Sequence, residues 1–196
     1  MPSQLPLPGI AAPAPATDRF FFALLPDETA AQSINRCARE LQRAYGLRSR
    51  LLAPHRLHLS LQHLGNHVGF PASWVDAARR AAARIDFPAF DLCFDRVLTL
   101  SAHAREPRPL PCVMTAAFSA SLHRFHTSLG LAMRDSGIVV QSRSFTPHIT
   151  MFYDPLAIEE RPIEAIYFMV REFVIIHTLI GTGRRYELLG RWLLRS

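Results

Sequence analysis

Two short segments with the same residue pattern most constrain how this chain can fold. Residues 58–61 read His-Leu-Ser-Leu, and residues 148–151 read His-Ile-Thr-Met. Polar and apolar residues alternate in each, which is typical of a β-strand, whose successive side chains point to opposite faces. The imidazole and the hydroxyl then share one face, with apolar side chains on the other. We expect two strands, from opposite halves of the chain, that bring both polar pairs to one cleft.

Composition limits the chemistry that the chain can perform. The 196 residues suffice for one domain or for two closely packed lobes, and 49% hydrophobic residues are enough for a core. All 22 basic residues are arginine, which excludes Schiff-base, lysyl-adenylate and P-loop chemistry, because each needs a lysine amine. The net charge of +6 suits phosphate binding, and it also suits a solvated basic surface without a partner.

Residues 1–18 are expected to form a disordered tail, because prolines interleaved with alanines leave little apolar surface to bury. They lack the basic start of a signal peptide, and no apolar run in the chain is long enough to span a membrane. Cys37, Cys93 and Cys112 have no metal-like spacing and are expected to be buried thiols in a reducing compartment. We therefore expect a cytoplasmic protein with a single domain over residues 19–196.

The order of the predicted elements indicates an α+β fold with mainly antiparallel sheets. Helices are predicted from the Asp27 N-cap to about residue 45, over 72–84, and over 119–136, ending at Gly46 and Gly137 in the first and third cases. Strands are predicted at residues 19–25, 57–62, 90–101, 111–116, around 148, 165–179 and 184–194, with a loop at 65–70. A strand-helix-strand unit precedes each histidine motif. We expect a bilobed molecule, with lobes related by a pseudo-twofold axis, flanking helices and an active-site cleft between the lobes.

The nine histidines also allow a metal site or purely structural roles to be considered. His55, His58, His63 and His67 crowd one stretch, but His63 and His67 lie on a predicted strand and loop, where a spacing of four does not bring two ligands together. We expect no metal site there. The remaining residues are expected on a helix edge (His123, His126), in an arginine-bearing loop (His103) and in the core with a hydrogen bond (His177). Either motif histidine alone is more compatible with a structural strand histidine, whereas two such histidines, each with a hydroxyl two residues later, favour a functional role.

The paired motifs and their flanks resemble the two-histidine phosphoesterase superfamily. Within it, the chain is most similar to RNA 2′,3′-cyclic phosphodiesterases, historically called 2′-5′ RNA ligases, of the LigT or ThpR type. The resemblance covers most of residues 19–195. It includes the opening strand from Arg19, the Leu64-Gly65 pair after the first motif, residues 143–147 before the second, and the closing segments 171–173 and 185–192.

The resemblance implies a metal-independent enzyme without a cofactor, with one motif in each lobe. His58 would be the proton donor and His148 the proton acceptor, although the residues alone do not decide which histidine plays which part. Histidine suits both tasks near neutral pH. Ser60 and Thr150 would bind the substrate phosphate by donating hydrogen bonds to its non-bridging oxygens. The expected reaction is hydrolysis of an RNA 2′,3′-cyclic phosphate end to a 2′-phosphate, with 2′-5′ ligation as its reverse, by a monomer.

Two positions depart from the family pattern, and they bear more on which substrate is preferred than on which type of reaction is catalysed. Ser60 stands where relatives more often have threonine, which keeps the hydroxyl. Tyr153 stands where many relatives have arginine, so a phosphate contact would come from elsewhere, with Arg143, Arg105 and Arg108 as candidates. The alternatives are a phosphodiesterase acting on small cyclic nucleotides, such as an ADP-ribose cyclic phosphate, and a nucleotide- or RNA-binding module without catalysis.

Overall fold

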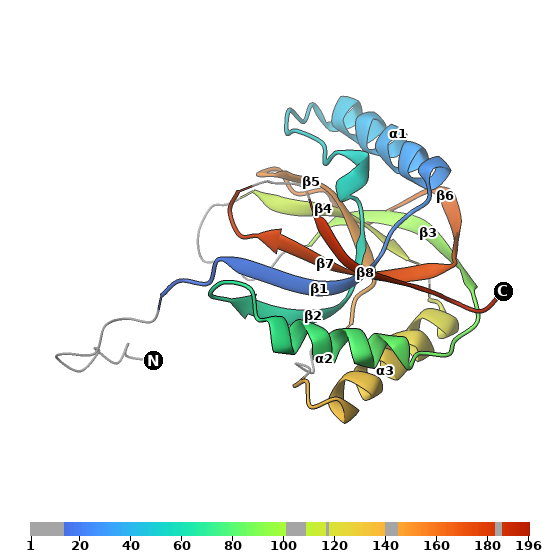
Figure 1. Cartoon of the computed structure of the whole chain (residues 1–196). Coiled ribbons are helices and arrows are strands. Elements are labelled where there is room, and N and C mark those ends of the chain that lie inside the picture. The colour runs from blue at the N-terminus through green and yellow to red at the C-terminus, as the bar shows by residue number, and fades with distance from the viewer. Residues whose placement is uncertain (1–13, 101–108, 117, 140–144, 183–185) are drawn as a thin grey trace, which may run out of the picture.

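A single antiparallel β-sheet organises the chain, as Figure 1 shows for the computed structural model. The structure describes residues 14–100, 109–116, 118–139, 145–182 and 186–196. The helices are α1 (Glu28–Tyr45), α2 (Ala72–Ala83) and α3 (Ala120–Asp135), with a 3-10 turn at Pro54–Arg56. The strands are β1 (Asp18–Leu24), β2 (Leu59–His67), β3 (Phe90–Thr99), β4 (Leu110–Ala116), β5 (His148–Asp154), β6 (Arg161–Val170), β7 (Glu172–Leu179) and β8 (Glu187–Leu193). The α+β prediction is confirmed.

The sheet divides into two halves at the two motif strands. Its strand order is β6-β3-β4-β5-β2-β1-β7-β8, so that β5 and β2 are the inner strands of two four-stranded halves. In the described part of the chain, the two inner strands are paired through Leu59 opposite Ile149. The two predicted lobes are therefore present as halves of one sheet, with one histidine motif on each side of the seam.

The junction between β6 and β7 shows how strongly the sheet curves. Val170 ends β6 and Glu172 begins β7, although the two strands are first and seventh in the sheet. Consecutive Cα atoms are about 3.8 Å apart, so the two ends of the sheet must approach each other at Arg171. The prediction of one strand over residues 165–179 was wrong, because alternating apolar residues continue on both sides of this turn.

Two helices pack against the sheet half opposite to the one that they connect. The helix α1 connects β1 to β2 but packs against β5 and β6, and α3 connects β4 to β5 but packs against β2 and α2. Figure 1 shows α1 on one side of the molecule and α2 with α3 on the opposite side. Each half is thus covered partly by a helix that belongs to the connection of the other half.

Helix ends follow the predicted signals closely. The Asp27 carboxylate accepts a hydrogen bond from the backbone N–H of Ala30 at 2.8 Å, and Gly46 ends α1 with a φ of 65°. The apolar stripe of α3 is fully buried; its members are Leu122, Phe125, Leu129 and Met133. No helix among the described residues is long and apolar enough to span a membrane.

The strand β2 is longer than predicted. It continues through residues 65–67, which were expected to form a loop, because they pair with β1 as far as Asp18 opposite His67. Gly65 allows this extension with a φ of 111°, a conformation that side chains disfavour. The first histidine motif is therefore anchored along a full strand.

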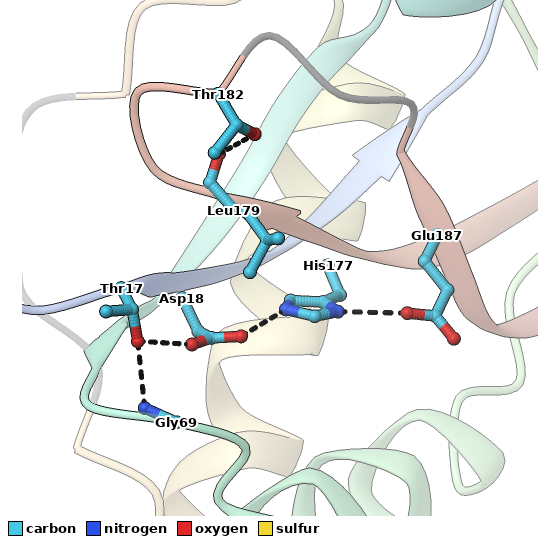
Figure 2. A network of polar contacts seen from close by, with 7 residues as sticks. All are labelled: Thr17, Asp18, Gly69, His177, Leu179, Thr182 and Glu187. Atoms are coloured by element: carbon cyan, nitrogen blue, oxygen red, sulfur yellow. Dashed lines mark hydrogen bonds and ion pairs between the residues drawn. The ribbon is translucent and has the colours of Figure 1, made fainter.

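A polar network fastens the start of β1 to β7 and β8 (Figure 2). The His177 ring lies between two carboxylates, with Nε2 2.6 Å from Asp18 and Nδ1 3.1 Å from Glu187. The Thr17 hydroxyl donates to Asp18 at 2.5 Å and accepts from the Gly69 N–H at 3.0 Å. The expectation of a hydrogen-bonded core histidine is confirmed. Residues 1–13 of the predicted tail lie outside the described residues, whereas Thr17 and Asp18 are part of the folded sheet.

Candidate active site

The seam between β2 and β5 brings the four motif side chains to one face of the sheet. Leu59 and Ile149 are fully buried and lie opposite each other. In an antiparallel pair, this register sets His58 opposite Thr150 and Ser60 opposite His148. Side chains directly opposite each other have Cβ atoms about 5 Å apart, and diagonal neighbours about 7–8 Å. The two imidazoles and two hydroxyls thus form a quartet around a space of about the size of a phosphate group.

Both histidines are held in the same way by the backbone two residues earlier. Nδ1 of His58 lies 2.8 Å from the Arg56 carbonyl oxygen, and Nδ1 of His148 lies 2.7 Å from the Thr146 carbonyl oxygen. A carbonyl can only accept a hydrogen bond, so each Nδ1 carries a proton and donates. In the neutral ring, Nε2 is then the unprotonated nitrogen. Each histidine can therefore exchange a proton with a substrate through Nε2, while Nδ1 fixes the orientation of the ring.

The surroundings of His58 change its proton affinity. Burial lowers the pKa of His58 below its ordinary value, the hydrogen bond to the Arg56 carbonyl opposes this, and the positive charges of His148 and Arg56 lower the pKa further. The centroid of the His58 ring lies 5.0 Å from that of Phe21 and 5.2 Å from that of Tyr186, whose ring is nearly perpendicular to it.

A small apolar patch lies beside His58 on the site face of the sheet. It consists of Phe21, Ala23, Val174 and Ile176, with Leu25 and Tyr186 against them. The neighbouring residues of β1 point to the opposite face and into the main core. The Arg56 guanidinium lies over the Tyr186 ring at 5.3 Å, a cation–π contact that keeps a positive charge near the site.

The motif hydroxyls are accessible to a ligand. Ser60 is exposed and Thr150 is half-buried. Among the described residues, neither hydroxyl makes a hydrogen bond, so both are available as donors to a bound group. Phosphate oxygens are suitable acceptors for them.

A β-bulge follows the hydroxyl in each motif. The pairing with β1 shifts after Ser60, leaving Leu61 as the additional residue, and the pairing with β4 shifts after Thr150, leaving Met151. The bulge occupies the same motif position in both halves, which supports their pseudo-twofold relation. Bulges also re-aim the side chains that follow them.

The bulge in β5 turns Tyr153 toward the site face. Thr150 is opposite Val113, and Tyr153 is opposite Pro111, two residues before Val113 on β4. Residues two apart on a strand share a face, so Tyr153 lies on the same face as Thr150. Its side chain is 50% exposed. A residue three positions after the hydroxyl therefore reaches the site, where strict alternation would place it on the other face.

The same geometry places His63 on the site face, which sequence reasoning missed. Ala23 and Phe21 of β1 are opposite Ser60 and His63 respectively, and both belong to the patch beside His58. His63 is thus the counterpart of Tyr153 in the other half. The signal in the sequence was the equal spacing of three residues after each hydroxyl.

Other predicted positions lie elsewhere or outside the described residues. Arg105, Arg108, Arg143 and His103 are not among the described residues. Within the described part of the chain, no group of three or more histidine, cysteine or carboxylate side chains could hold a metal ion.

A cavity of about 450 Å³ lies between α1 and β6. Its lining includes Arg36, Cys37, Glu40 and Arg161, and no motif residue. Burial raises the pKa of the Cys37 thiol to about 11, which keeps it a protonated, weakly reactive thiol. None of the four motif side chains of the quartet faces this cavity.

No protein-family model matches the sequence, and neither does the sequence of any curated protein. Solved structures do match over nearly the whole chain. E. coli LigT complexed with 3′-AMP has a TM-score of 0.69 and 26% identity, covering 92% of this chain and 99% of LigT. E. coli LigT complexed with ATP has a TM-score of 0.67 and 28% identity with the same coverage.

A third structure extends the comparison at the level of fold. The Thermus thermophilus protein TT0787 has a TM-score of 0.71 at 18% identity, covering 91% of this chain and 98% of TT0787. In fold, therefore, this chain is a relative of LigT and related phosphoesterases, which is consistent with the two-histidine phosphoesterase superfamily.

Proposed function

We propose that this chain hydrolyses the 2′,3′-cyclic phosphate end of RNA to a 2′-phosphate, with the two motif histidines as acid and base and without a metal ion. The observation that carries this proposal is the quartet at the seam. Two histidines whose Nε2 atoms are unused, next to two hydroxyls, supply the groups that an in-line displacement at phosphorus needs. The similarity to LigT supports the coarser conclusion of an enzyme that acts on phosphodiester bonds.

The reaction forms one bond and breaks another at phosphorus. Nε2 of His148 takes a proton from water as the water oxygen attacks, and the bond to the ribose 3′ oxygen breaks. Nε2 of His58 donates its proton to that leaving oxygen. Ser60 and Thr150 donate hydrogen bonds to the non-bridging oxygens, where negative charge accumulates in the transition state. The division between donor and acceptor follows the family resemblance, since the two rings have the same backbone support.

The environment of His58 affects the donor role. Burial favours its neutral form in the free protein, whereas a donor must be protonated. A bound phosphodiester carries a negative charge, which favours the protonated form and compensates for burial. We therefore expect His58 to be protonated chiefly when the substrate is bound.

The direct test is incubation with an oligonucleotide that ends in a 2′,3′-cyclic phosphate, in the presence of EDTA. The expected product is a 2′-phosphate, formed at a rate that EDTA does not change. Loss of activity with EDTA would contradict the metal-free mechanism, and a 3′-phosphate product would contradict the assignment of the leaving oxygen.

A second candidate function is hydrolysis of a small cyclic nucleotide. It is favoured by LigT structures that contain 3′-AMP, ATP or NADP+, which are small nucleotides. Turnover of an ADP-ribose cyclic phosphate that exceeds turnover of a cyclic-ended RNA would establish it. Binding of 2′-AMP without hydrolysis of any cyclic phosphate, at any pH, would instead indicate a binding module.

A further inference from the structure

Four aromatic rings contact one another in series next to the second motif, and the catalytic quartet does not use them. This aromatic array consists of Phe118, His123, Phe145 and His126. Phe118 stacks on His123 with ring centroids 5.1 Å apart and an interplanar angle of 27°. His123 meets Phe145 edge-on at 5.7 Å, and Phe145 stacks on His126 at 3.8 Å and 9°.

The inner rings of the array are fixed by hydrogen bonds. His126 Nε2 lies 2.9 Å from the amide nitrogen of Gln62, a buried side chain that is opposite Phe22 and so lies on the core face of the sheet. His123 Nδ1 lies 2.9 Å from the Ser119 carbonyl oxygen. These hydrogen bonds hold the two imidazoles of the array in position.

The outer ring is almost fully exposed. Phe118 has 84% of its surface accessible, although it is one of the largest apolar side chains. A ring that stacks on one face and is open on the other can accept a second flat group. Nucleobases are such groups, and stacking on aromatic side chains is how many proteins bind single strands without base preference.

The array lies within reach of the proposed reaction centre. The backbone N–H of Ala116 donates to the carbonyl oxygen of Pro147, the residue before His148, at 3.3 Å. Phe118 is two residues beyond Ala116, so its Cα lies within about 7 Å of this contact. Phe145 precedes the same histidine by three residues. Phe118 and Phe145 therefore both lie within three residues, along the chain, of the backbone contact that precedes His148.

The charge around the array favours a polyanion. Asp135 is the single acidic residue between positions 107 and 153, whereas this stretch contains four arginines. Asp135 pairs with Arg84 of α2 at 3.4 Å. Arg124 of α3, which neighbours His123, is exposed and makes no ion pair among the described residues. The stretch of sequence that contains the array is therefore net basic, which suits a phosphate backbone.

We propose that the aromatic array binds the nucleotides on the 5′ side of the cyclic end, so that the substrate is a single-stranded oligonucleotide rather than a mononucleotide. A 2′,3′-cyclic phosphate closes the 3′ end of an RNA, so all further nucleotides lie on its 5′ side. This inference rests on the proposed function, because it assumes that the cyclic phosphate occupies the quartet. It adds a subsite to that reaction and names the substrate class.

The test compares two substrates in three proteins. The substrates are a 2′,3′-cyclic mononucleotide and a tetranucleotide with the same cyclic end. The proteins are the wild type, Phe118→Ala, and Tyr167→Ala as a matched control. Tyr167 is 67% exposed on the outermost strand β6, so its removal also trims a surface aromatic ring. Because Phe118 is so exposed, its replacement is expected to leave the fold intact, which a melting curve checks.

The wild type should prefer the tetranucleotide, and Phe118→Ala should lower kcat/KM for it about 5- to 150-fold, as expected for one lost base stack. Hydrolysis of the mononucleotide should not change, Phe118→Trp should retain the preference, and Tyr167→Ala should behave as the wild type. Equal turnover of both substrates by the wild type, or an equal loss on both in Phe118→Ala, would overturn the inference while leaving the proposed function intact. Failure to hydrolyse either substrate would instead overturn the proposed function.

Discussion

Replacement of His58 by asparagine separates the chemical role of the ring from its structural role. The asparagine amide nitrogen takes nearly the position of Nδ1, so it can keep the hydrogen bond to the Arg56 carbonyl, which is 2.8 Å long in the native protein. Nothing replaces Nε2. We expect the rate of cyclic phosphate hydrolysis to fall by about 10²–10⁴-fold, the usual contribution of one acid-base group. This loss corresponds to about 2.7–5.5 kcal/mol in the activation free energy.

His58→Ala is the matched comparison. It removes the same nitrogen but also leaves the Arg56 carbonyl without its partner and the space between Phe21 and Tyr186 unfilled. An unsatisfied buried acceptor costs about 1–3 kcal/mol. The alanine variant should therefore be less stable than the asparagine variant by at least that amount, while both lose activity equally.

Single-turnover hydrolysis of a cyclic-ended RNA measures the activity, and urea unfolding measures the stability. The asparagine variant should keep a free energy of unfolding near that of the wild type. If His58→Asn retained more than about a tenth of the wild-type rate, the assignment of Nε2 as an acid-base group would be wrong. If both variants were equally stable, the hydrogen bond from Nδ1 would not support the ring.

Three further changes test neighbouring parts of the argument. Thr150→Val keeps the shape but removes the hydroxyl, and it should lower kcat about 10²–10³-fold with little change in melting temperature; an unchanged kcat would exclude a transition-state contact. Tyr186→Ala exposes one side of the His58 ring to water, so the pKa of His58 should rise toward its ordinary value. The limb of the pH profile of kcat/KM that depends on His58 should then move to higher pH, and a shift to lower pH would contradict this reasoning. The Thr17 hydrogen bond, and to a smaller extent His177, lower the pKa of Asp18 in the folded protein. The ionised Asp18 carboxylate therefore stabilises the fold fully above the unfolded-state pKa. This contribution to the free energy of unfolding is lost as the pH falls through the lower folded-state pKa. Asp18→Asn should therefore destabilise the protein at neutral pH, with a difference in unfolding free energy that shrinks on acidification; a constant difference in urea unfolding would refute the electrostatic cause.

Local signals were sufficient to predict the helices and the two motif strands. Asp27 marks the start of α1 and Gly46 marks its end, and both could be predicted because capping geometry is determined by neighbouring residues. The alternation at each motif correctly placed Leu59 and Ile149 in the core. Whether the two motifs would meet side by side depended on pairing across the chain, for which the local pattern contains no information.

The errors arose where tertiary pairing overrides the alternating pattern. Nothing in residues 165–179 marks Arg171 as a turn, because the apolar period continues and the ends of the sheet converge there for global reasons. The bulges at Leu61 and Met151 were equally hidden, since an inserted residue is defined by the partner strand. Without the bulges, alternation assigns Tyr153 to the wrong face.

The aromatic array was also beyond local reasoning. Its members come from the connection between β4 and α3, from α3 and from the segment before β5, and the prediction for His123 and His126 went no further than a helix edge. Only the folded arrangement shows that Phe145 connects them to the second motif.

The crossing of α1 and α3 has a consequence for how this protein can be divided. Strands β7 and β8 complete the sheet half that contains His58, yet they come from the last quarter of the chain, after the half that contains His148. A cut between α2 and β3 would produce two fragments, each with one motif and each lacking partners for its apolar surfaces. Neither piece could bury its core alone, so both would fold only by associating. Reconstitution and catalytic competence would then appear together, because the interface that restores the fold includes the seam at which the two histidines meet.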